Sequence, residues 1–160
     1  MKFKPVEDWD EEYLINEVLI PTGVDEYSWI EFKGKEIFDD FDNFDNQVAK
    51  QLSGFGNAEG GYLIFGINDD TRRIDGGIVK DFKKEPKNWL TQKIPNLTDD
   101  KTTDYDIKLI EKTPNGSAIN EGCVIIVVEI RPHEKAPIQS TKDLKFYLRM
   151  SDHTLPMTKQ

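Results

Sequence analysis

The sequence predicts an α+β fold with a mixed, mostly antiparallel sheet and helices packed on it. Two segments, residues 7–20 and 45–55, place apolar side chains at helical spacing. Two others, 62–67 and 124–130, are apolar at both parities, which is typical of strands covered on both faces. Strand patterns gather in the C-terminal half and are joined by short turns, which favours antiparallel pairing.

Taken in order, the first helix over residues 7–20 ends at Pro21 and Gly23. Residues 29–33 alternate as a strand, with Ile30 and Phe32 on one face and Trp29, Glu31 and Lys33 on the other. Acidic DDFDNFD (39–45) reads as an exposed loop. A helix then begins near Asp45 as its N-cap and buries Val48, Leu52 and Phe55.

The glycine pair Gly60-Gly61 is expected to form the sharp turn from this helix into the strand YLIFGI. Residues 71–77 then predict a tight turn or hairpin. Pro86 is suited to the first turn of a short helix that Pro95 closes. Three strands follow, over 104–109, 124–130 and 144–149. In the last of them Lys145 and Arg149 are predicted to share the outer face.

The chain has 160 residues and a net charge of -9, and its acidity is uneven. Residues 1–46 hold 14 acids and four bases, whereas residues 47–160 hold 16 acids and 17 bases. We therefore expect an acidic helical arm (1–20), one folded domain (21–155) and a tail (156–160). The near-neutral domain can carry a basic face, although solubilising surface charge explains the same counts.

The start of the chain turns acidic at once and has no apolar core, so no signal peptide is expected, and no apolar run is long enough for a spanning helix. One cysteine, Cys123, lies in an apolar run and reads as a small buried hydrophobe. We therefore expect a cytoplasmic protein without a membrane partner. The ending LPMTKQ has no clear cap, as in a chain cut from a longer protein.

Carboxylates are the leading candidates for chemistry. Glu26, Glu31 and the pair Asp69-Asp70 lie at predicted strand edges or turns, and such oxygens suit Mg²⁺ or Mn²⁺. Glu26 and Glu31 have opposite parity, so they can converge only if Glu26 lies in the preceding turn or beyond a bulge. Solvated surface charge is the alternative explanation for these acids.

Basic residues near these acids could contact phosphates: Lys33, Arg72, Arg73 and Arg149. Lys33 could instead pair with Glu31 on the same strand face, and each of the others is equally explained as solvated surface. The motif GNAEGG lacks the Lys-Ser/Thr of a P-loop and leads into a strand. His133 and His153 are too few and too isolated for a zinc cluster.

Four blocks together resemble the Schlafen AlbA-like domain family. They are EYSWIEFKGK (26–35), LSGFGNAEGGYLIFGINDD (52–70) with its RRIDGG continuation, the region of Pro137, and FYLRMSD (146–152). In order and spacing these blocks cover roughly residues 20–155. In Schlafen endoribonucleases two glutamates and an aspartate form a metal-binding catalytic trio, which the resemblance places on Glu26, Glu31 and Asp69, with Asp70 as the fallback.

The resemblance implies a metal-dependent endonuclease, an endoribonuclease acting on structured RNA such as transfer RNA, with RNA favoured over DNA. It also implies a homodimer, because Schlafen cores pair two lobes around a groove. Two alternatives stay open: a non-catalytic nucleic-acid-binding module of a DNA-binding regulator, and a protein-interaction domain whose acidic arm docks on a basic partner. Net charge below zero and the acidic loop after Gly34 depart from the expected pattern.

Overall fold

The computed structural model describes residues 3–19, 29–80, 85–151 and 153–157. Its centre is a sheet in which β7 pairs antiparallel with β2, β5 and β6, while β1 pairs parallel with β2. This mixed, mostly antiparallel sheet with helices confirms the predicted α+β class. The strands are β1 (Ile30–Lys33), β2 (Gly61–Phe65), β3 (Ile67–Asn68), β4 (Arg73–Ile74), β5 (Ile78–Val79), β6 (Tyr105–Glu111), β7 (Cys123–Ile130), β8 (Tyr147–Met150) and β9 (His153–Pro156).

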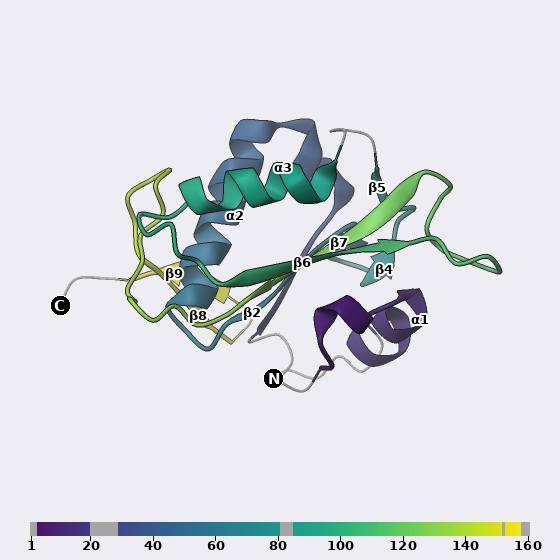
Figure 1. The fold of residues 1–160 in the computed structure, drawn as a ribbon, viewed down its shortest axis with the longest axis horizontal. Helices are drawn as coiled ribbons and strands as arrows, with labels where there is room; N and C mark the ends of the chain where they lie inside the picture. The colour runs from purple at the N-terminus through teal and green to yellow at the C-terminus, as the bar shows by residue number, and fades with distance from the viewer. Residues whose placement is uncertain (1–2, 20–28, 81–84, 152, 158–160) are drawn as a thin grey trace.

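Helical segments cover both faces of the sheet, with α2 and α3 on one face and α1 on the other (Figure 1). Each face therefore has its own apolar core, and β2, which is buried along its whole length, contributes to both. The helical segments are η1 (Val6–Asp8), α1 (Glu11–Tyr13), the π-helical η2 (Leu14–Leu19), η4 (Lys35–Asp39), α2 (Phe41–Gly56), α3 (Pro86–Lys93) and η5 (Ile94–Asn96).

The N-terminal segment packs onto the sheet rather than extending from it. Trp9, Leu14 and Val18 are buried in the core beside β1 and β2. The buried Glu11 carboxylate accepts hydrogen bonds from the Ala118 amide at 2.8 Å and from the Ser117 hydroxyl, which ties α1 to the loop before β7. The predicted domain limits stay predictions, since residues 20–28 lie outside the described residues.

The expected acidic loop over residues 39–45 is wrong, because most of this segment belongs to helix α2. The helix begins at Phe41, not near Asp45, because the Asp40 carboxylate accepts hydrogen bonds from the Asp42 and Asn43 amides and caps the first turn. Phe44, one turn before Val48, is fully buried and extends the apolar stripe of the helix. Tertiary burial of Phe44 thus outweighs the local acidity that suggested a loop.

The β8–β9 hairpin lies against α2 and forms its own two-stranded sheet. The predicted strand over 144–149 is shifted, since Leu144 has a left-handed φ of 59° and is exposed, whereas Tyr147 and Arg149 are buried. The expected outer position of Arg149 is therefore wrong. Strand β1 and the turn at Gly60, whose φ is 79°, follow the sequence prediction.

Candidate functional site

A pocket of about 290 Å³ opens beside β1, and three segments distant in sequence form its wall. These are the strand β1 itself, the turn between β3 and β4, and the β8–β9 hairpin. We call it the β1 pocket. The residues that line it are Ile30, Glu31, Phe32, Asp69, Arg72, Arg149 and His153. Four of the seven residues proposed from sequence therefore meet here, namely Glu31, Asp69, Arg72 and Arg149.

Glu31 lies between two cations. Its Oε1 accepts a hydrogen bond from Arg149 at 2.6 Å, and its Oε2 lies 3.2 Å from the Lys33 ammonium. The Glu31 side chain is 18% exposed, so these pairs are only partly screened by water. The alternative of a same-face Lys33–Glu31 ion pair is thus realised, and both carboxylate oxygens are engaged by protein cations.

Arg149 holds the hairpin against the rest of the fold. Its side chain is 2% exposed, and its guanidinium donates to the Ile30 carbonyl at 2.7 Å and to Thr154 Oγ1 at 3.1 Å. Thr154 in turn donates to Gln51 Oε1 on α2 at 2.7 Å. One arginine therefore connects β1, β9 and, through Thr154, helix α2, which fixes the position of the charge beside Glu31.

The β3–β4 turn supplies the opposite wall. Asn68 accepts hydrogen bonds from the Asp70 and Thr71 amides through its side chain, and from the Arg72 amide through its carbonyl. This network holds Arg72 in a left-handed conformation at φ 58°. The Arg72 Nε donates to the Asp69 carbonyl at 3.0 Å, and its guanidinium lies 4.8 Å from the Phe32 ring centre.

The remaining predicted residues lie elsewhere. Lys33 contacts Gln47 Oε1 at 3.3 Å and borders the β1 pocket through Glu31. Arg73, on β4, is exposed and lines the neighbouring cavity instead. Glu26 lies outside the described residues, so its place relative to Glu31 stays a prediction. Asp70 is exposed and is absent from the lining of the β1 pocket.

Sequence reasoning missed His153 as a site residue. It pairs with Met150 across the β8–β9 hairpin, and this brings it to the pocket that Arg149 lines. The available signal in the sequence was the pair Ser151-Asp152 after Met150, because serine and aspartate favour turns. Without knowing that the hairpin packs on β1, the sequence gives no reason to join His153 to Glu31.

The described residues do not by themselves form a metal centre. Within the described ranges, no group of three His, Cys, Asp or Glu side chains is placed to hold an ion. The Glu31 oxygens are engaged by Arg149 and Lys33, and the lining of the β1 pocket balances two acids with two arginines. Divalent ions prefer an excess of carboxylate oxygens, which Glu31 and Asp69 alone do not supply here.

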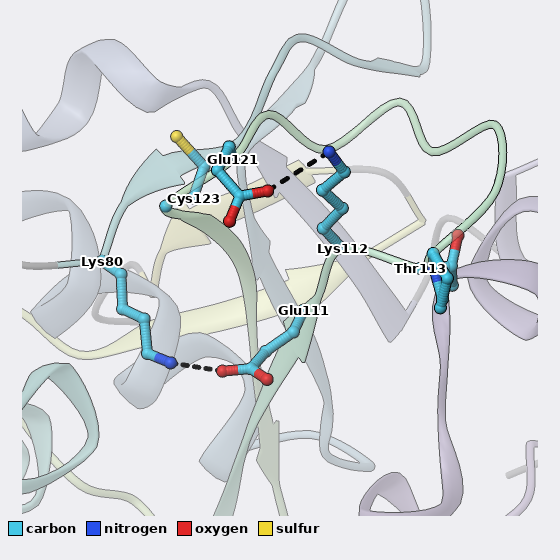
Figure 2. A pocket seen from close by; sticks show the side chains of 8 residues that line it. Lys80, Glu111, Lys112, Thr113, Glu121 and Cys123 are labelled. Atoms are coloured by element: carbon cyan, nitrogen blue, oxygen red, sulfur yellow. Dashed lines mark hydrogen bonds and ion pairs between the residues drawn. The ribbon is translucent and has the colours of Figure 1, made fainter.

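A larger pocket of about 440 Å³ lies at the far end of the sheet, near the start of β7 (Figure 2). Lys80 pairs there with Glu111, and Lys112 pairs with Glu121 at 3.3 Å, while Cys123 lies beside them. Within each of these exposed pairs the two charges neutralise each other, and such pairs contribute little to stability. None of the residues proposed as a site from sequence lines this pocket.

The fold and the β1 pocket define an α+β domain whose paired acids and bases sit beside a short parallel strand pair. The family model described as Schlafen, AlbA_2 matches residues 26–158, so the chain belongs to this family. This confirms the resemblance seen in the sequence blocks. Among the described residues, no helix is both long enough and apolar enough to cross a bilayer.

One similar solved structure is that of the DIP2311 protein from Corynebacterium diphtheriae. The two share 22% sequence identity and superpose with a TM-score of 0.54. The match covers 81% of this chain but 22% of the other, so this chain spans about a fifth of the length of that protein. At this identity the likeness shows the fold.

Proposed function

We propose that this protein binds the phosphate backbone of nucleic acid at the β1 pocket, with RNA favoured over DNA. One observation carries the proposal: Arg72 and Arg149 come from two separate elements and line one pocket, and Lys33 pairs with Glu31 of the same lining. In a chain whose net charge is -9, the two arginines of the lining balance its two acids, so the pocket is less acidic than the chain as a whole. Membership in the Schlafen AlbA_2 family supports a nucleic-acid-related role.

The charge arrangement suits a phosphate. Arg72 presents a planar guanidinium group, which binds phosphate oxygens in a two-pronged geometry. Arg149, whose nitrogens already donate to Glu31, Ile30 and Thr154, adds fixed positive charge to the wall. Arg72 is already positioned by the Asp69 carbonyl and the Phe32 ring, so little of its side-chain entropy is lost when a ligand arrives. Arg149 lies 2.6 Å from Glu31 and Arg72 Nε lies 3.9 Å from Asp69 Oδ1, so a bound phosphate competes with these two carboxylates for the arginines.

The test is binding of a labelled single-stranded RNA, measured by fluorescence anisotropy over a range of salt concentrations. Arg72→Gln should weaken binding and lower the slope of log affinity against log salt by about one. Lys145→Gln is the matched control, because Lys145 is exposed and does not line the pocket. Equal losses in the two variants, or no binding by the folded wild type, would sink the proposal.

A second candidate function, a metal-dependent endonuclease, is favoured because Glu31 and Asp69 line the same pocket although 38 positions separate them. The proposed ligands for Mg²⁺ or Mn²⁺ are Glu26, Glu31 and Asp69, and the proposed substrate is structured RNA such as transfer RNA. A bound ion would supply Lewis-acid stabilisation of the phosphate and an activated water. The two described acids do not fit an ion alone, so this candidate depends on Glu26.

Incubating transfer RNA with the protein in Mn²⁺, in Mg²⁺ and in chelator tests this second candidate. Cleavage that needs metal and is lost in Asp69→Asn, but kept in Asp70→Asn, would establish it. Asp70 is the matched control because it is an exposed acid in the same turn as Asp69 and does not line the β1 pocket. Intact RNA in every condition, together with salt-sensitive binding, would leave the binding module as the function.

The proposal also includes a homodimer. Met150 on β8 and Leu155 on β9 are large apolar side chains that are 55% and 49% exposed. The same two strands contribute Arg149 and His153 to the lining of the β1 pocket. Covering such side chains stabilises association. A single sedimentation species at monomer mass across a wide concentration range would contradict pairing, and Leu155→Lys should abolish any dimer that forms.

A further inference from the structure

A second pocket lies on the other side of Arg72. It has a volume of about 560 Å³ and is formed where the N-terminal helical segment meets the β3–β4 hairpin. Figure 1 shows β4 beside α1 on the same face of the sheet. Its apolar wall is made of Ile15, Leu19, Ile74 and Ala118. We call it the hairpin pocket, and its size is within the range of small-ligand sites.

Arg72 lines both pockets and is held in place between them. The Asn68 turn fixes its backbone, the Asp69 carbonyl accepts from its Nε, and the Phe32 ring lies under its guanidinium. A planar cation held in this way divides the cavity surface into two parts. The polar part contains Glu31 and Arg149, and the apolar part contains Ile15 and Ile74.

The chemistry of the hairpin pocket selects its occupant. Among the described residues that line it, Arg72 and Arg73 carry charge and no acid is present, so a cationic ligand gains nothing there. Aliphatic walls beside a guanidinium suit a flat, weakly polar group that is joined to an anion. A nucleobase attached to its phosphate has that character, and bases stack readily on arginine planes.

We propose that the hairpin pocket receives one unpaired base of the strand whose phosphate lies in the β1 pocket, with Arg72 contacting both. This inference rests on the proposed function. A paired base has its edge hydrogen-bonded and both faces stacked, so it cannot enter without being released from the duplex. The protein should therefore prefer single-stranded over double-stranded nucleic acid of the same length.

The experiment compares two single-stranded probes of equal length, one with bases and one with an abasic sugar-phosphate backbone. Wild-type protein should bind the strand with bases about tenfold more tightly, within the range measured for one stacked base. Ala118→Phe fills the hairpin pocket and should bring the two affinities within about twofold, while the affinity for the abasic strand stays unchanged. Asn115→Phe, at an exposed position of the same loop outside the pocket lining, should behave as wild type.

Ile15→Gln gives a second variant on the opposite wall, so the test survives if Ala118→Phe does not fold. Equal affinity of wild type for the two probes would overturn the base pocket and leave phosphate binding intact. Equal affinity for duplex and single strand would overturn it as well. If the folded wild type binds neither probe, the proposed function itself fails, and this inference fails with it.

Discussion

Arg149 and Glu31 form an ion pair at 2.6 Å across 118 positions of sequence, and the arginine side chain is 2% exposed. The pair joins the C-terminal hairpin to the first strand of the sheet. Arg149 also donates to the Ile30 carbonyl, so backbone and side chain of β1 are held by the same group. Stability and the shape of the β1 pocket therefore depend on one residue.

Replacing Arg149 with Gln should lower the free energy of unfolding by about 3 kcal/mol, because the partly buried Glu31 carboxylate, the Ile30 carbonyl and Thr154 lose their shared donor. Urea unfolding followed by circular dichroism measures this. The double variant Glu31→Gln/Arg149→Gln should recover part of the loss, since the carboxylate that Arg149→Gln leaves without its closest cation is removed as well. Lys145→Gln, at an exposed position, should change stability by less than about 0.5 kcal/mol. Equal losses of stability in Arg149→Gln and Lys145→Gln would argue against a specific pair between Arg149 and Glu31.

The start of α2 can be tested at its cap. Asp40→Ala should cost about 1 kcal/mol, because the Asp42 and Asn43 amides lose their acceptor. Asp39→Ala is the comparison, since Asp39 is the exposed neighbour that precedes the cap. Thermal unfolding of the two variants separates the effects. Equal melting temperatures would contradict Asp40 as the N-cap.

Gly60 lies at the turn into β2 with φ 79°, and an added Cβ would lie 2.5 Å from the Ile130 carbonyl oxygen. Gly60→Ala should therefore lose at least about 2 kcal/mol, from backbone strain and from the clash together. Gly116 has a similar φ of 69° but open space around the added atom. Gly116→Ala should lose only about 1 kcal/mol, from the backbone alone. Chemical denaturation of both variants measures the difference, and equal losses would mean that the Ile130 contact is unimportant.

Glu129, on β7, should destabilise the fold at neutral pH. Burial raises the pKa of its carboxyl, an effect that nearby Asp106, Glu7 and Asp104 reinforce and that Arg131 opposes. A raised folded-state pKa means that the native protein binds the proton more tightly than the unfolded chain, so stability falls as pH rises through this range.

Glu129→Gln should accordingly be more stable than wild type at pH above the raised value, and this advantage should shrink as pH falls toward the ordinary glutamate range. Urea midpoints across a pH series give the comparison. The control is Glu121→Gln, because the Glu121 side chain is 90% exposed and its replacement removes no buried charge. An advantage that grows on acidification would show that the ion pair with Arg131 outweighs burial.

The local pattern of apolar and polar residues was enough to predict several elements of this fold. The alternation in β1 put Ile30 and Phe32 in the core, and the two-sided apolar runs became the central strands β2 and β7. Pro86 starts α3 as its fixed φ favours. The blocks around Glu31 and Asp69 also pointed to the Schlafen AlbA_2 family, because short motifs keep their order and spacing along the chain.

Only the tertiary structure decided which face of the C-terminal strand is buried. Phe146 and Leu148 alternate with Tyr147 and Arg149, so both faces offer apolar contact area and the local pattern favours neither strongly. Glu31 decides which face is buried, because its carboxylate pairs with the Arg149 guanidinium and offsets the cost of burying that charge. This pairing is possible only once the hairpin lies on β1. The β1 pocket exists for the same reason: its charges belong to segments that only folding brings together.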